Sequence, residues 1–160
     1  MSGSMDRSAG LHHDAVAGHR PAVLFVCVRN GGKSQMAAGL LRHLAGDAAA
    51  VSSAGTEAGT SLNALSVEVL AELGIDISGQ RPQQLTPQLI QDADLIVTLG
   101  RDAVVDTGDT ATPVENWDID EPSSRGVEGI ERMRLVRDDI AGRVEALVGR
   151  LTRIRLRRIS

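Results

Sequence analysis

Apolar and polar residues are arranged along the chain in blocks that predict strands and helices in turn. Short apolar runs bounded by turn residues predict buried strands at residues 23–26, 49–53, 95–99 and 114–119. Apolar residues spaced three and four apart predict helices at residues 34–44, 62–73, 87–92 and from about Val127 onward. Strands that alternate with helices fold into a mainly parallel sheet covered by helices. We therefore predict an α/β fold, a three-layer sandwich around a four-stranded, mainly parallel sheet.

The ends of these predicted elements carry local signals, and their spacing predicts which side chains are buried. The helix at 62–73 is expected to have Gly74 as its C-cap, and the helix at 87–92 to have Thr86 as its N-cap. Residues 100–113 show no periodicity and are predicted to form a long loop. The predicted inward-facing residues of the first two helices are Met36, Leu40, Leu41, Leu44, Leu62, Leu65, Val69, Leu70 and Leu73.

Composition limits how the core is built and which partners the chain can bind. Phe25 and Trp117 are its only aromatic residues, so the core must consist mainly of aliphatic side chains. A net charge of −4 and the scarcity of aromatic rings argue against a nucleic-acid partner. No apolar run approaches the roughly 18 residues that a membrane span needs, so no membrane partner is predicted.

Length and cysteine content predict the organisation and compartment of the protein. The 160 residues fit one domain, which we place at residues 21–160. Residues 1–20 lack the apolar stretch of a secretory signal and are predicted to be a flexible leader, either native or left from expression. The single cysteine excludes an intramolecular disulfide and a CxxC site. We therefore predict a cytoplasmic protein.

The candidate chemistry is concentrated between Cys27 and Ser34, directly after the first predicted strand. The thiol is followed by a Gly-rich turn, by the chain's only lysine, Lys33, and by the start of a helix. The backbone N–H groups of such a turn converge on an oxyanion, and the helix N-terminus adds roughly half a positive charge. This environment favours the thiolate, so Cys27 is predicted to be a nucleophile. The alternative is a buried structural cysteine beside an ordinary turn.

The positions of this loop have distinct expected roles. Asn30 tolerates the left-handed conformation and can fix the loop through its side chain. Lys33 supplies a positive charge near the anion, and Ser34 can donate to the thiolate and cap the helix. Arg29 either helps to capture the anion or points to solvent. The predicted substrate-binding residues are Val28, Arg29, Asn30, Gly31, Gly32, Lys33 and Ser34.

The sequence VLFVCVRNGGKSQMAAGL at residues 23–40 resembles the catalytic loop of the low-molecular-weight tyrosine phosphatase superfamily, and above all that of its arsenate reductases. The similarity extends in order over residues 22–148. Matching segments lie at residues 52–56, 62–63, 72–78, 94–99, 117–122 and 131–140. The resemblance implies the fold of that superfamily, arsenate as substrate, and Cys27, Lys33 and Ser34 as catalytic residues.

Two departures from the superfamily pattern narrow the expected reaction. Most relatives have arginine where this chain has Lys33, so a planar, bidentate group is replaced by a compact charge. Arsenate reductases that use an internal disulfide cascade carry two further cysteines, and Gly100 and Thr107 occupy those positions here. This combination resembles the actinobacterial arsenate–mycothiol transferases. The resemblance implies mycothiol as co-substrate, mycoredoxin as reductant, and no bound cofactor.

A second chemical element precedes Pro122. Superfamily members place an aspartate before a proline in a mobile loop, where it protonates the departing oxygen. The same register assigns this role to Glu121, and the adjacent Asp120 is the alternative. Asp118 is expected to belong to a solvated acidic turn.

No metal site is predicted. The four histidines, at positions 12, 13, 19 and 43, lack metal-ligand spacing. Relatives with a disulfide cascade can bind potassium through an asparagine, a glutamate and a serine. Asn30 and Ser53 match two of these positions, but Ala38 replaces the glutamate, so the site is expected to be lost. The arginines at residues 150–158 are predicted to form a solvated helix end.

These features predict arsenate detoxification. The Cys27 thiolate attacks arsenate and the arsenic passes to mycothiol, with reduction to arsenite completed by a redoxin. One alternative is a phosphatase of the same fold that acts on phosphotyrosine or small phosphoesters. Another is a non-catalytic oxyanion-binding sensor.

Overall fold

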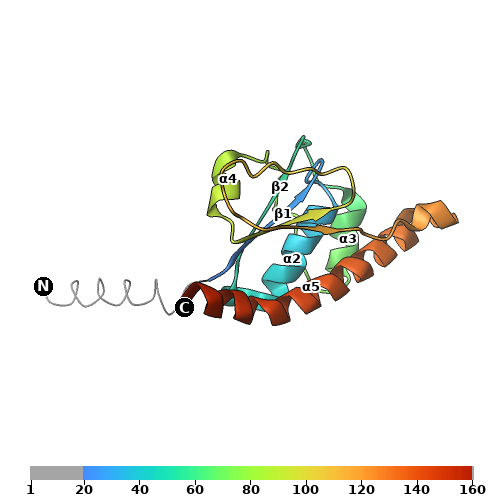
Figure 1. The fold of residues 1–160 in the computed structure, drawn as a ribbon. Helices are drawn as coiled ribbons and strands as arrows, with labels where there is room; N and C mark the ends of the chain where they lie inside the picture. The colour runs from blue at the N-terminus through green and yellow to red at the C-terminus, as the bar shows by residue number, and fades with distance from the viewer. Residues whose placement is uncertain (1–19, 160) are drawn as a thin grey trace, which may run out of the picture.

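A computed structural model describes residues 20–159, so the predicted leader lies almost entirely outside the described residues. A parallel sheet lies at its centre (Figure 1). Its four strands have the order β2-β1-β3-β4. The strands are β1 (Ala22–Cys27), β2 (Ala50–Gly55), β3 (Leu95–Leu99) and β4 (Val114–Trp117). The helices are α2 (Lys33–Ala45), α3 (Ala64–Ala71), α4 (Pro87–Asp92) and α5 (Gly129–Ile159), with 3-10 turns η1 (Gly46–Ala48) and η2 (Pro122–Arg125).

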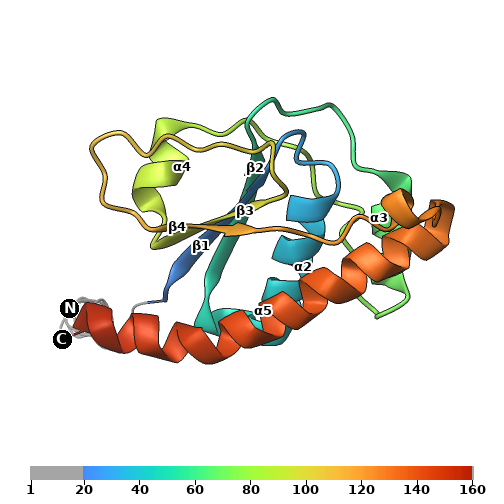
Figure 2. The same cartoon turned by 45° about the vertical axis from the view of Figure 1, so that its right-hand side comes forward.

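Helices cover the two faces of the sheet and complete the predicted three-layer sandwich. In Figure 2, α2, α3 and α5 lie on one side of the strands, and α4 lies on the other. Alternate residues of β1 point to opposite faces, as strand geometry requires. Val23 and Phe25 belong to the larger core under α2 and α5, whereas Leu24 and Val26 pack with Ile90 of α4. The expected α/β fold is therefore confirmed.

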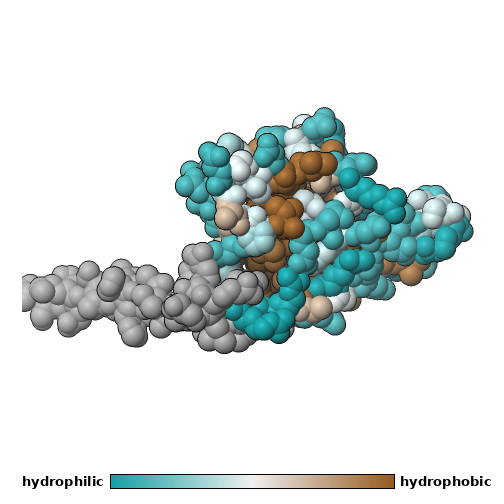
Figure 3. All heavy atoms as spheres, viewed as in Figure 1, coloured by the Kyte–Doolittle hydropathy of each residue, from teal (hydrophilic) through white to brown (hydrophobic). Residues whose placement is uncertain are grey.

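The larger core contains both aromatic residues of the chain. The rings of Phe25 and Trp117 lie 5.7 Å apart between centroids and are tilted by 56°. The rest of this core is aliphatic or sulfur-containing, as the composition predicts. Figure 3 shows a mostly hydrophilic face of the molecule with a strip of hydrophobic residues between the regions of α4 and α5.

Several local predictions are confirmed, and some element ends differ. Thr86 caps α4 by accepting a hydrogen bond from the backbone N–H of Leu89 at 3.2 Å. Residues 100–113 form an irregular loop. The helix predicted at 62–73 is shorter because Asn63 is its N-cap and accepts from the N–H of Ser66 at 2.9 Å. The strand predicted at 114–119 ends at Trp117.

Three predictions at helix ends are wrong. Leu44 and Leu73 are each 45% exposed. Leu44 occupies the last turn of α2, just before the chain reverses at Gly46, and Leu73 follows the end of α3, where helical periodicity no longer sets the direction of the side chain. Gly74 does adopt the left-handed conformation, with φ of 77°, but the C-cap is Glu72, two positions earlier.

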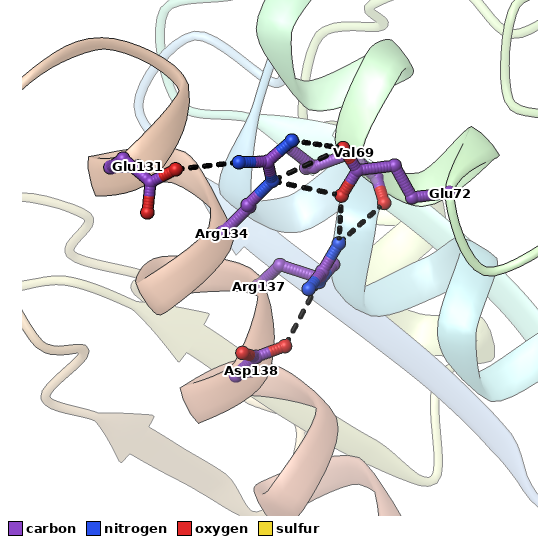
Figure 4. A network of polar contacts seen from close by, with 6 residues as sticks. All are labelled: Val69, Glu72, Glu131, Arg134, Arg137 and Asp138. Atoms are coloured by element: carbon purple, nitrogen blue, oxygen red, sulfur yellow. Dashed lines mark hydrogen bonds and ion pairs between the residues drawn. The ribbon is translucent and has the colours of Figure 1, made fainter.

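A polar network attaches α5 to the end of α3 (Figure 4). Both oxygens of Glu72 accept hydrogen bonds from Arg134, and Oε1 also accepts one from Arg137 at 2.7 Å. Arg137 donates in addition to the carbonyl of Val69 at 2.9 Å. The hydrogen bonds from Arg134, followed by those from Arg137, hold the pKa of Glu72 at about 2. The network fixes the N-terminal half of α5 against α3.

Candidate active site

A cleft of about 980 Å³ opens at the carboxyl ends of the strands, where parallel α/β sheets commonly bind ligands. It is lined by the loop after β1, by the loops before α3 and after β3, by residues 118–124 and by the first turns of α5. Cys27 lies in its wall at the end of the central strand β1. The structure thus brings the two predicted chemical elements, residues 27–34 and 118–121, into one cavity.

Two groups form hydrogen bonds with the sulfur of Cys27. The backbone N–H of Asn30 donates to Sγ at 3.2 Å, and the hydroxyl of Ser34 lies 3.0 Å from it. The cysteine is buried, with 8% of its surface exposed. The predicted contact between Ser34 and Cys27 is therefore present.

Asn30 fixes the shape of the loop, as predicted. Its φ of 57° is the only positive φ of a non-glycine residue in the described chain. Its side-chain amide donates to Ser34 Oγ at 2.7 Å and its Oδ1 accepts from the backbone N–H of Gln83 at 2.9 Å. Gln35 Nε2 donates to the same oxygen at 3.2 Å and to the Asn30 carbonyl at 3.1 Å. Asn30 is fully buried, so these bonds are shielded from water.

Neighbouring segments hold the carbonyl groups of the loop away from the cleft. The N–H groups of Thr56, Glu57, Gly59 and Asn63 donate to the carbonyls of Cys27, Val28, Arg29 and Gly31, at 2.7 to 3.0 Å. In a trans peptide, the N–H group points opposite to the carbonyl of the preceding residue. The N–H groups that follow these carbonyls therefore face the other side, as that of Asn30 does when it donates to Cys27 Sγ. This orientation of the N–H groups is the one that the predicted oxyanion cradle at residues 27–34 requires.

Two glycines allow the loop to approach its supports. A Cβ on Gly55 would lie 2.6 Å from the carbonyl oxygen of Val28, and one on Gly31 would lie 3.0 Å from that of Ser61. Real Cβ atoms do not approach backbone this closely without a shift of the chain. Gly32 lines the cleft and is the N-cap of α2, so the expectation that Ser34 caps this helix is wrong: Ser34 is its second residue.

Lys33 and Glu121 contact each other directly in the cleft. The ammonium of Lys33 donates to Glu121 Oε1 at 2.6 Å, and Arg132 of α5 donates to Oε2 at 3.0 Å. The hydrogen bond from Lys33, followed by that from Arg132, lowers the pKa of the Glu121 carboxyl. Glu121 is therefore ionised at neutral pH in this arrangement, and Lys33 is already paired with an anion.

The neighbouring carboxylates are also paired with arginines. Asp120 accepts two hydrogen bonds from Arg125, at 2.8 and 3.0 Å. These hydrogen bonds lower the pKa of the Asp120 carboxyl. Asp118 is exposed and pairs with Arg101 at 3.2 Å, which lowers its pKa in the same way. Asp118 thus lies at the rim of the cleft in a solvated turn.

The remaining predicted positions lie at the rim or away from the cleft. Arg29 is exposed at the cleft mouth, with its side chain beside Gly59. His43 is exposed on α2, and the other three histidines lie outside the described residues. Gly100 lines the cleft with φ of 91°, and a Cβ there would lie 3.7 Å from Lys33 Nζ. Within residues 20–159, His, Cys, Asp and Glu side chains form no group of three that could hold a metal ion.

Sequence reasoning missed three residues of the site. Arg132 reaches Glu121 from α5, and Gln35 and Gln83 fix Asn30. Gln83 lies 53 positions from Asn30, in a segment without helical or strand periodicity, so no local pattern points to this contact. Gln35 is buried in α2, and its place directly after Ser34 was the available signal.

The comparisons with known proteins agree with this geometry. The model of the low molecular weight phosphotyrosine protein phosphatase family matches residues 22–156. The arsenate reductase of Bacillus licheniformis is 36% identical over 133 residues, which are 79% of this chain and 94% of that protein. The arsenate reductase of Bacillus subtilis is 36% identical over 130 residues, which are 77% of this chain and 91% of that protein.

Solved structures give the same result. The thioredoxin-dependent arsenate reductase of Corynebacterium glutamicum has 32% identity and a TM-score of 0.71, over 89% of this chain and 69% of that one. The arsenate reductase of Archaeoglobus fulgidus has 31% identity and a TM-score of 0.65, over 79% of this chain and 98% of that one. The described residues contain no helix long and apolar enough to cross a membrane. By sequence and by fold, the chain belongs to the low molecular weight phosphotyrosine protein phosphatase family, and within it is similar to arsenate reductases.

Proposed function

We propose that this arsenate reductase transfers arsenic from arsenate to an external low-molecular-weight thiol, with mycothiol as the co-substrate and a mycoredoxin as the reductant. The observation that carries the proposal is that Cys27, held in an oxyanion cradle, is the only cysteine of the chain. An internal disulfide needs a second thiol. Gly100 and Thr107 occupy the two positions at which cascade enzymes have their further cysteines. The thiol that completes the reaction must therefore come from another molecule.

The first step forms a bond between sulfur and arsenic. Arsenate binds to the N–H groups of residues 28–34 and to Lys33, and the Cys27 thiolate attacks arsenic in line with the oxygen that leaves. One As–O bond breaks, and the oxygen departs as water with its own proton and one from Glu121, or from Asp120 as the alternative. Proton donation to a leaving oxygen contributes typically about 10²–10⁴-fold to the rate.

The second step transfers arsenic to the external thiol. The thiol gives its proton to the carboxylate that acted as the acid, and its sulfur attacks arsenic. The bond between Cys27 and arsenic breaks, Cys27 returns as thiolate, and arsenic remains pentavalent in the released adduct. The redoxin thiolate then attacks the adduct's sulfur, so that arsenic leaves with the electron pair as arsenite and a mixed disulfide forms. This chemistry needs a reducing compartment, which we propose to be the cytoplasm.

The proposal is tested by measuring arsenite formation with three reductant systems in parallel: mycothiol with mycoredoxin, glutathione with glutaredoxin, and thioredoxin with its reductase. We expect turnover with mycothiol and mycoredoxin and none with thioredoxin, because thioredoxin reduces a disulfide that this chain cannot form alone. Cys27→Ser should abolish turnover. No consumption of arsenate with any system, or turnover that survives Cys27→Ser, would refute the proposal.

Two other functions are distinguished by simple measurements. A phosphatase of this fold would hydrolyse an aryl phosphate faster than it turns over arsenate. An oxyanion sensor would bind arsenate or phosphate without turnover, and Cys27 would alkylate at neutral pH no faster than a free thiol. The lysine in place of the usual loop arginine and the absence of tyrosine argue against the phosphatase.

A further inference from the structure

Two cations hold one carboxylate over the cleft. Lys33, Glu121 and Arg132, named here the clasp, come from the first turn of α2, the segment before η2 and the first turns of α5. Lys33 binds Oε1 of Glu121 at 2.6 Å and Arg132 binds Oε2 at 3.0 Å. The side chains of Lys33 and Arg132 are each 28% exposed, so water reaches them only in part. The two cations thus bind different oxygens of the same group.

An oxyanion that enters the cradle competes with Glu121 for the ammonium of Lys33. Lys33 lies at the end of the loop at residues 27–34, and its ammonium is the only lysine charge available there. A dianionic oxyanion attracts an ammonium about twice as strongly as one carboxylate does at equal distance. Substrate binding therefore draws Lys33 from Glu121 toward the cradle. The hydrogen bond between Arg132 and Oε2 does not depend on this change.

We propose that Arg132 is a positioning residue for the reaction, which retains the Glu121 carboxyl in the cleft after an oxyanion has drawn Lys33 away. This inference rests on the proposed function, in which Glu121 protonates the departing oxygen. Arg132 can serve as a fixed support because α5 is attached to α3 through Glu72. Its Nε is buried and has no hydrogen-bond partner in the described part of the chain, so the base of the guanidinium is enclosed.

This exchange, in which Lys33 leaves Glu121 for the oxyanion, also explains how an ion-paired carboxylate can become an acid. Lys33 is the largest cause of the lowered pKa of Glu121, so its departure raises that pKa, and a nearby oxyanion raises it further. Arg132 alone continues to lower it. The other charged groups that line the cleft are Arg29, Arg101, Asp102, Asp118 and Asp120, and of these Asp118 and Asp120 are already paired with Arg101 and Arg125. Substrate binding thereby prepares the acid.

Kinetics of two substitutions test the positioning role. In Arg132→Met, we expect kcat for arsenate to fall about tenfold or more while KM changes less than threefold, because Arg132 contacts the acid and not the oxyanion. Arg132→Lys should recover most of the lost kcat, since an ammonium can also hold the carboxylate. Arg150→Met is the matched control: Arg150 lies on the same helix and binds Glu115 through two hydrogen bonds outside the cleft. It should leave kcat and KM unchanged.

The pH profile of kcat separates positioning from folding. The wild-type profile should fall on its alkaline side as the acid loses its proton, and Arg132→Met should flatten this limb. A variant that is merely less stable would lower the whole profile without changing its shape. An unchanged kcat in Arg132→Met, or a loss that appears only in KM, would overturn the inference.

A measurement without turnover keeps this inference distinct from the proposed function. In protein with ¹³C-labelled glutamate carboxyls, the Glu121 signal is assigned with Glu121→Gln and titrated with and without inorganic phosphate. We expect phosphate to raise the Glu121 pKa in the wild-type protein. If phosphate binds and the titration does not move, Lys33 is not drawn away and the inference fails, even if arsenate is turned over. If the titration moves but no thiol supports turnover, the exchange stands and the proposed reaction is refuted.

Discussion

Replacing Asn30 with alanine tests whether one side chain holds the catalytic loop in shape. The substitution removes three side-chain hydrogen bonds, with Ser34, Gln35 and Gln83 at 2.7, 3.2 and 2.9 Å. Each is worth about 1 kcal/mol net. It also places an alanine at φ of 57°, which costs roughly 1–2 kcal/mol. Together these effects predict a loss of about 4–5 kcal/mol in the free energy of unfolding.

Urea unfolding followed by circular dichroism measures this loss. The midpoint should fall while the slope with denaturant concentration stays constant, because the folded chain remains as compact. A loss of this size is a large part of the 5–15 kcal/mol that stabilises a typical domain. Turnover should fall as well, because the N–H of residue 30 and the hydroxyl of Ser34 would no longer be fixed beside Cys27 Sγ.

Asn30→Gly separates the cost of the left-handed backbone conformation from the loss of the side-chain hydrogen bonds. Glycine tolerates the left-handed conformation but costs about 0.5–1 kcal/mol in unfolded-state entropy. We therefore expect Asn30→Gly to be as stable as Asn30→Ala or up to about 1.5 kcal/mol more stable. A loss below about 0.5 kcal/mol in Asn30→Ala would show that these hydrogen bonds do not stabilise the fold. A glycine variant clearly less stable than the alanine variant would show that the left-handed strain is misjudged.

Two further substitutions test the supports of the site. Gly55→Ala places a Cβ 2.6 Å from the carbonyl oxygen of Val28, so it should displace the cradle, lower kcat and cost about 1–3 kcal/mol of stability, as measured by turnover and urea unfolding. Gly142→Ala on α5 is its control, because a Cβ there meets nothing within 4 Å. Its stability should rise by up to about 1 kcal/mol with turnover unchanged. Equal effects of the two substitutions would contradict a steric role for Gly55. Glu72→Gln should destabilise the protein at neutral pH, because the folded-state pKa of Glu72, about 2, lies below its value of 4.5 in an unfolded chain. That difference from wild type should be complete above pH 4.5 and vanish as the pH falls toward 2 in pH-dependent unfolding; a difference independent of pH would exclude the network in Figure 4 as its cause.

Local sequence patterns predicted the strands and the conformation of the loop at residues 27–34 well, because both depend on neighbouring residues. The run at residues 23–26 forms the centre of β1, and Asn30 adopts the left-handed conformation that its side chain tolerates. Helix ends were harder, since Leu44 and Leu73 fit the apolar spacing but lie where their helices stop covering the core.

Long-range contacts of the site could not be predicted from the pattern. Lys33 and Glu121 were each expected in the site, but 88 positions separate them, and nothing local indicates that they bind each other. Arg132 is one of sixteen arginines in the chain, several of them on the same helix. Which of them faces the cleft depends on the rotation of α5, and packing of that helix on α2 and α3 decides it.

The Lys33–Glu121 contact can be followed in the wild-type protein by chemical labelling. Since the chain has one lysine side chain and one thiol, and both lie in the same loop, amine-selective and thiol-selective reagents can label the site at two separate atoms without mutagenesis. The carboxylate of Glu121 covers the amine from one side, so the acylation rate of Lys33 follows how often that contact opens. Cleavage by an arginine-specific protease, followed by mass spectrometry, would read the two labels on separate fragments, because Arg29 lies between Cys27 and Lys33.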